Sequence, residues 1–109
     1  MISILFPTDF SKNSMNAINY ALEFFKYERV EFYFMHAYQK EVYDHEDLVT
    51  RENFDDVLKR VKAQSEASLD ELLKTVKKIA PNPRYTYHSI SAYGSLVEEA
   101  NRIADTKNI

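Results

Sequence analysis

The sequence predicts an α/β protein in which a parallel β-sheet is flanked by helices. Strand-like apolar runs alternate along the chain with segments whose apolar residues recur at helical spacing, in the order β-α-β-α-β-α. Each pair of successive strands is therefore joined by a helical connection, as parallel strands require. The 109 residues, 45% of them hydrophobic, are enough for the core of one domain, residues 1–109.

The first strand is predicted at Ile2–Phe6, where only Ser3 interrupts an apolar run, so the strand should be buried on both faces. Thr8 and Asp9 follow it directly. This order brings a carboxylate to the carboxyl end of a strand, which is the end where open α/β sheets bind ligands.

The first helix is predicted from about Lys12 to about Lys26, with Ser11 as its N-cap. Its inward residues are Met15, Ile18, Ala21, Leu22 and Phe25. The second strand, Val30–Ala37, is rich in aromatic residues.

A long acidic loop is expected from Tyr38 to Asn53, and Asn53 could cap the helix that follows. That helix should end before Pro81 and Pro83. Its predicted inward stripe is Phe54, Val57, Leu58, Val61, Ser65, Ser68, Leu69, Leu72, Leu73, Val76 and Ile79.

The third strand is predicted at Arg84–Ser91, and its polar residues suggest a place at the sheet edge. Gly94 should turn the chain into a last helix, which Ser95 and Glu98 open as a capping box. The inward residues of this helix should be Leu96, Val97, Ala100, Ile103 and Ala104.

The composition excludes several classes of function. The formal charge of −3 and the acidic pI of about 5.6 argue against a nucleic-acid partner. The absence of cysteine excludes disulfides, thiolate nucleophiles and Cys metal sites. No apolar run is long enough to span a membrane and no secretory signal is evident, so a cytoplasmic protein is expected. With Gly94 as the single glycine, the usual glycine-rich phosphate cradle cannot be present.

The apolar gradient from the first strand to the third predicts the strand order 3-2-1. This order leaves the first strand at an edge, although it is the most apolar. Because a bare apolar edge favours aggregation, further chain or a second copy should cover it.

The chain resembles the universal stress protein family in three places. The first is the opening Ile4–Ser11 together with the Ala-containing helix around Asn16–Leu22 that follows it. The second is Phe34–Ala37 at the end of the second strand, and the third is Tyr93-Gly94 before the last helix. The resemblance implies a flavodoxin-like, adenine-nucleotide-hydrolase-like sheet in the order 3-2-1-4-5. It also implies that strands four and five and the Gly-rich phosphate loop are missing here, so that the chain is the N-terminal part of the domain.

The resemblance further implies a binding protein for ATP or AMP that often forms homodimers and is not an enzyme. Pro7, Thr8 and Asp9 match residues that line the family's adenosine pocket, and Ala37 matches a wall of the adenine site, where Val is usual. Without the phosphate loop, binding should be far weaker than in the full-length protein. The alternative is a family member that binds no nucleotide and acts as a dimerising interaction module.

Simpler interpretations stand beside these. Asp9 could merely cap the first helix or bond nearby backbone, and His36 could be a packed, hydrogen-bonded residue, since no Ser/His/Asp spacing suggests a catalytic base. His88 is expected at the surface. The run Asp44–Asp47 matches no metal-ligand spacing and is expected to be a solvated loop, so neither a metal site nor a catalytic residue is predicted.

Overall fold

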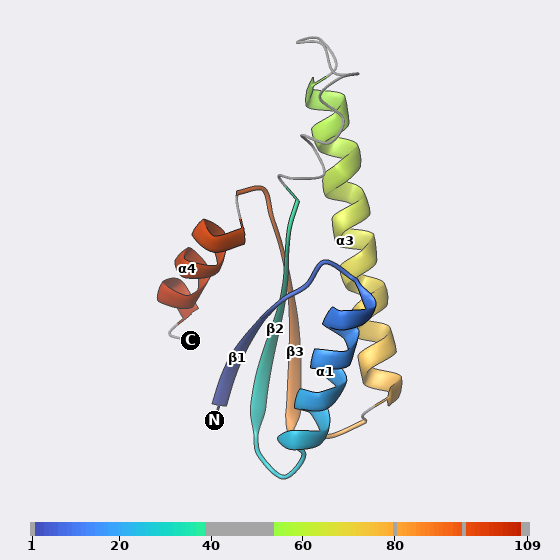
Figure 1. Cartoon of the computed structure of the whole chain (residues 1–109), viewed down its shortest axis with the longest axis vertical. Coiled ribbons are helices and arrows are strands. Elements are labelled where there is room, and N and C mark those ends of the chain that lie inside the picture. The colour runs from blue at the N-terminus through green and yellow to red at the C-terminus, as the bar shows by residue number, and fades with distance from the viewer. Residues whose placement is uncertain (1, 39–53, 80, 95, 108–109) are drawn as a thin grey trace.

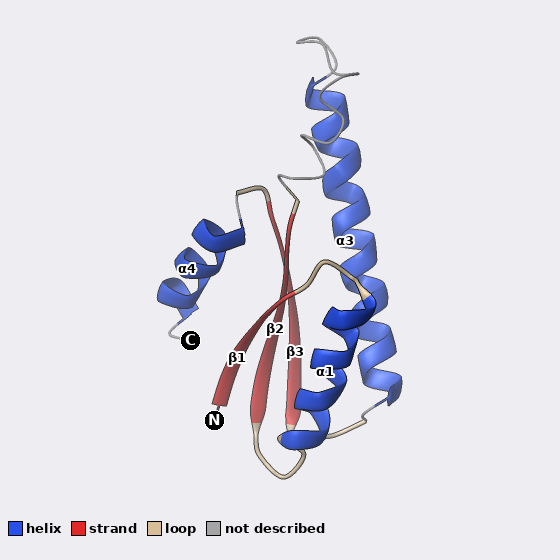
Figure 2. Cartoon of the chain, in the orientation of Figure 1, coloured by secondary structure: helices blue, strands red, loops and turns tan. Residues whose placement is uncertain are grey.

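The structure is a computed structural model that describes residues 2–38, 54–79, 81–94 and 96–107. It contains three strands, each followed by a helix (Figures 1 and 2). In chain order these elements are β1 (Ile2–Pro7), α1 (Lys12–Phe24), β2 (Val30–Ala37), α3 (Phe54–Ile79), β3 (Tyr85–Ala92) and α4 (Leu96–Lys107).

The strands form one parallel sheet with β2 between β1 and β3. Val30 pairs with Ile2 on one side and with Tyr85 on the other, which sets the register of the whole sheet. The predicted fold class and the predicted order 3-2-1 are therefore confirmed. The predicted strand ends differ from the observed ones by one residue for β1 and β3.

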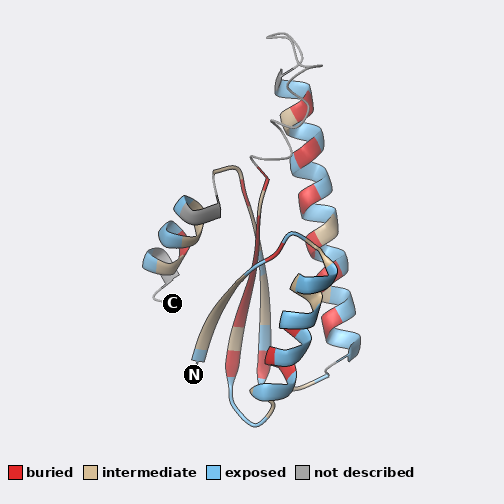
Figure 3. Cartoon of the chain, viewed as in Figure 1, coloured by how far each residue is buried: buried red, intermediate tan, exposed pale blue. Residues whose placement is uncertain are grey.

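The helices lie in two layers. Figure 1 shows α1 and α3 on one side of the sheet and α4 on the other, where α4 contacts β1 and β2. This arrangement makes α/β/α layers in which β2 is covered on both faces. Accordingly, every residue from Phe32 to His36 is buried (Figure 3).

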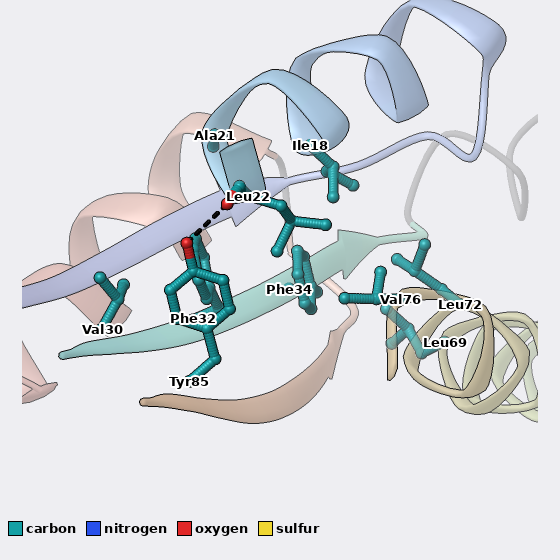
Figure 4. Close-up of a cluster of buried hydrophobic side chains, with 10 residues drawn as sticks. All are labelled: Ile18, Ala21, Leu22, Val30, Phe32, Phe34, Leu69, Leu72, Val76 and Tyr85. Carbon is teal, nitrogen blue, oxygen red and sulfur yellow. Dashed lines mark hydrogen bonds between the residues drawn. The ribbon is translucent and has the colours of Figure 1, made fainter. Parts of the chain in front are cut away.

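The core fills the space between the sheet and the layer formed by α1 and α3. Phe32 and Phe34 stack in parallel on β2, with their ring centroids 6.0 Å apart. The hydroxyl of Tyr85 donates a 2.6 Å hydrogen bond to the carbonyl of Leu22, which joins β3 to α1 (Figure 4). The buried cluster consists of Ile18, Ala21, Leu22, Val30, Phe32, Phe34, Leu69, Leu72, Val76 and Tyr85.

The helix ends follow from local chemistry. The side chain of Ser11 accepts a hydrogen bond from Ser14 N, so the predicted N-cap of α1 is confirmed. The predicted stripe of α3 holds from Val57 to Val76, which is fully buried, but Ile79 is 55% exposed. The prediction that Ile79 faces inward was wrong because the last turn of α3 extends past the core.

The prediction that Ile2–Phe6 is buried on both faces was also wrong. Residues 3–6 are half-buried and Ile2 is 38% exposed. The physical reason is position: within the described chain β1 is an edge strand, whereas β2 has neighbours on both sides. The expected loop 39–53 and the expected caps Asn53 and Ser95 lie outside the described residues.

Candidate functional site at the carboxyl ends of the strands

The chain leaves β1 through a tight, hydrogen-bonded loop. Thr8 is buried, and its backbone N donates a 2.8 Å bond to the carbonyl of Met35 on β2. Its Oγ1 accepts bonds from Phe10 N (3.0 Å) and from the hydroxyl of Ser14 (2.7 Å). Thr8 therefore fixes the path from β1 into α1, and its side chain faces the protein interior.

Asp9 lies at the surface of this loop. Its Oδ1 accepts a 2.9 Å bond from Ser11 N, which is the simple backbone-bonding role that the sequence left open. The hydrogen bonds from Ser11 lower the pKa of the Asp9 carboxyl below its ordinary value. Asp9 is therefore held as an anion at the carboxyl end of β1.

Phe10 adopts a backbone conformation that is rare for a bulky residue. Its φ is 63°, in the left-handed region where Cβ crowds the backbone. The bond from its N–H to Thr8 and the contact of its ring with the His36 ring, 4.7 Å between centroids, hold it there. Strain of this kind persists where the surroundings define the conformation. Sequence reasoning missed Phe10, since nothing in its residue type predicts a positive φ.

Pro7 and Ala37 end neighbouring strands. Pro7 pairs in register with Met35, two residues before Ala37, so alternation places both on the sheet face opposite the α1/α3 core. Pro7 is exposed and Ala37 half-buried. The structure thus brings Pro7, Asp9 and Ala37 to the same end of β1 and β2, although Asp9 turns towards the start of α1.

His36 is buried beside the middle of α3. Its Nδ1 lies 2.7 Å from Ser65 Oγ, and Ser65 Oγ lies 2.8 Å from Ser91 Oγ. One chain of polar contacts thus joins the ends of β2 and β3 to α3. Sequence reasoning missed the roles of Ser65 and Ser91. The available signal was Ser65, a hydroxyl residue within the inward stripe of α3.

A serine hydroxyl against an imidazole is also the pairing that activates nucleophiles. Ser65, however, is only 2% exposed, and its hydroxyl already contacts Ser91. These contacts favour a structural role, in which the polar chain positions α3 on the sheet.

A hollow of about 180 Å³ opens beside this polar chain. It adjoins a second hollow of about 320 Å³, and the two share Phe10 and Ser68. The residues lining the smaller one are Phe10, His36, Val61, Gln64, Ser65 and Ser68. The strained loop after β1 therefore forms one wall of a shallow groove along α3.

His88 lies on the opposite sheet face, where it pairs in register with Tyr33. Its side chain is 41% exposed, as a surface residue should be, and its Nε2 lies 2.8 Å from Glu31 Oε1. The Tyr33 hydroxyl donates a 2.6 Å bond to the same oxygen, and the pKa of Tyr33 is raised chiefly by this bond. The structure keeps this cluster apart from Asp9 and His36.

Within the described ranges, no group of three or more His, Asp or Glu side chains is arranged to hold a metal ion. The run Asp44–Asp47 lies outside those ranges. No helix in the part of the chain that the structure describes is long and apolar enough to cross a membrane.

The fold is similar to that of a known protein. A solved structure of the universal stress protein UspA from Lactobacillus plantarum superposes with a TM-score of 0.74, covering 98% of this chain and 70% of that chain. The sequence identity is 14%, so the likeness is one of fold. No family model matches the chain, and no curated protein matches it by sequence.

Proposed function

We propose that this protein is a universal-stress-type protein that binds an adenine nucleotide, ATP or AMP, and is not an enzyme. The observation that carries the proposal is that Pro7, Asp9 and Ala37 all lie at the carboxyl ends of β1 and β2. The similarity of the fold to that of the universal stress protein UspA supports the assignment to this type of protein.

In this proposal, adenosine lies across the ends of β1 and β2. Asp9, which is a carboxylate at neutral pH, accepts hydrogen bonds from ribose hydroxyls or from the adenine amino group. Pro7 and the small side chain of Ala37 form the apolar contact surface. Thr8 acts indirectly, since its hydroxyl holds the loop that carries Asp9.

The composition sets the expected pattern of affinity. Gly94 is the single glycine in the 109 residues, so these residues contain no glycine-rich cradle for phosphates. The adenosine portion should therefore supply most of the binding free energy. Adenosine, AMP and ATP should bind with affinities within a few-fold of one another.

Titration calorimetry with adenosine, AMP and ATP tests the proposal. The variant Asp9→Asn keeps an oxygen for Ser11 N but removes the charge, and it should weaken binding roughly tenfold, the value of one bond to a charged acceptor. Asp70→Asn, which removes an exposed carboxylate from α3, is the matched control. ATP should be recovered intact after incubation, because a binding protein is proposed. Absence of binding to all three ligands would overturn the proposal and favour the dimerising interaction module.

The proposed assembly is a homodimer in the cytoplasm. Within the described residues β1 pairs on one side only, with β2, so its other edge is available to a second strand. Sedimentation over a range of concentrations should detect the dimer, and a strictly monomeric chain would contradict it.

A further inference from the structure

Arg29 and Arg84 lie side by side at the opposite end of the sheet, where the strands begin. Arg29 directly precedes β2 and Arg84 directly precedes β3. Val30 pairs with Tyr85 in register, and Val30 N donates a 3.1 Å bond to the carbonyl of Arg84. The pairing of the two strands therefore brings these two arginines together.

The two arginines line a hollow of about 380 Å³, together with Pro83 and Thr86. This volume lies within the range of sites for small molecules. The residues that line it carry two guanidinium groups and one hydroxyl, and none of the described lining residues carries a carboxylate. The hollow is thus chemically suited to an anion.

Neither arginine has an opposite charge as a partner within the described part of the chain. Among the described residues, Glu23 pairs with Lys26 and Glu99 pairs with Arg102. Glu31 contacts His88 Nε2 and the Tyr33 hydroxyl. The chain has a net charge of −3 and five arginines, and two of these share one hollow in which no described residue contributes a carboxylate. Two neighbouring like charges repel each other, and a bound anion would relieve that repulsion.

Hydrogen bonds also hold the backbone that carries the two arginines. Asn82 Oδ1 accepts a 2.9 Å bond from Arg84 N, and Asn82 Nδ2 donates a 2.9 Å bond to the carbonyl of Lys26. Asn82 therefore joins the start of β3 to the turn that carries Arg29. Pro83 further restricts the backbone between Asn82 and Arg84. Such pre-organisation lowers the cost of binding.

We propose that Arg29, Arg84 and Thr86 form a binding site for the phosphate group of a small phosphorylated molecule. The planar guanidinium group binds phosphate oxygens in pairs, and a hydroxyl donates to a third oxygen. A phosphate monoester carries nearly two negative charges, which two arginines match. The site lies at the amino ends of the strands, so it is separate from the proposed adenosine site and does not depend on it.

NMR of the arginine side chains tests the site, with inorganic phosphate and glycerol phosphate as probes at constant ionic strength. The Nε–Hε signals of Arg29 and Arg84 should shift and saturate, while the signal of Arg60, exposed on α3, should not. Arg29→Gln and Arg84→Gln should each weaken binding roughly tenfold. Arg84→Lys keeps the charge but loses the paired donors. Its affinity for the probe should lie between those of the parent protein and of Arg84→Gln. Binding of the phosphate probes should be unchanged in Arg60→Gln and in Asp9→Asn.

Two results would overturn the proposal. Shifts that rise linearly with probe concentration and are equal at Arg60 would show charge screening only. Citrate binding as tightly as glycerol phosphate would show a general anion site without selectivity for phosphate. Amide spectra of each variant establish that the fold is intact, so that loss of binding reports on the site.

Discussion

The Nδ1 atom of His36 lies 2.7 Å from the Oγ atom of Ser65, and this contact anchors α3 to the carboxyl end of β2. Both side chains are buried, at 5% and 2% exposure. Ser65 also contacts Ser91, so one hydroxyl links α3 to two strands. The contact thus joins the helix to the end of the sheet where the proposed ligand binds.

Ser65→Ala should destabilise the protein by about 1–3 kcal/mol, because it removes the partner of a buried polar atom. Ser68→Ala, one turn further along α3 and half-buried, is the matched control, since both changes alter helix propensity equally. Urea unfolding of the two variants measures the difference. Equal stabilities would show that the contact between His36 and Ser65 contributes nothing to folding.

Tyr85→Phe should lower the free energy of unfolding by about 0.5–1.5 kcal/mol. The change removes only the hydroxyl, which donates a 2.6 Å bond to Leu22 O from a side chain that is 7% exposed. Tyr20→Phe provides the control, because Tyr20 is 70% exposed on α1. Thermal unfolding checks both variants, and a Tyr85→Phe protein as stable as the parent would contradict the expectation.

Gly94 is favoured by the space that a Cβ would need and not by an unusual φ. A Cβ at this position would lie 2.7 Å from Cγ of Glu99, and Gly94 does not have a positive φ. Glu99 is flexible but accepts a 2.9 Å bond from Arg102 Nε. Gly94→Ala should therefore move Glu99 and cost at most about 1 kcal/mol, the usual limit for a surface ion pair.

A double-mutant cycle separates this steric cost from other effects of the alanine. In the background Glu99→Ala, the side chain that would clash is gone, so Gly94→Ala should have little effect on stability. Urea unfolding of the parent, the two single variants and the double variant gives the coupling free energy between Gly94→Ala and Glu99→Ala. Additive effects would show that Gly94 and Glu99 do not interact.

The elements of the fold could be predicted because each depends on short-range sequence. The run Val30–Ala37 is rich in aromatic residues, which favour strands, and the apolar stripe ending at Val76 has the period of a helix. Burial was harder to predict. Whether Ile2–Phe6 is covered depends on what lies beside it in the sheet, and its own composition does not contain that information.

The candidate site could be predicted only in part. The strand ends that carry Pro7, Asp9 and Ala37 follow from the order of elements. The contact between His36 and Ser65 spans 29 positions, and it depends on where α3 lies against the sheet. The positive φ of Phe10 is likewise set by its neighbours in space, so no local pattern could predict it.

Asp9 should contribute a pH-dependent part of the stability. Hydrogen bonds from Ser11 lower its pKa in the folded state from the ordinary value of 3.8. Because the folded pKa is the lower one, the contribution is fully present above the unfolded value and is lost as the pH falls through the folded one. Asp9→Asn keeps an oxygen acceptor for Ser11 N but cannot ionise. As the pH falls below 3.8, the unfolding free energy of Asp9→Asn should therefore decrease less than that of the parent protein.

Urea unfolding between about pH 2 and pH 6 measures how the unfolding free energy depends on pH. NMR titration of the Asp9 carboxyl carbon measures its pKa in the folded state. The titration should give a midpoint below 3.8 in the folded protein. Asp70→Asn, which removes an exposed carboxylate with no cap role, controls for net charge. A midpoint at or above 3.8 would show that Ser11 does not stabilise the Asp9 anion, and it would contradict the predicted pH-dependent contribution to stability.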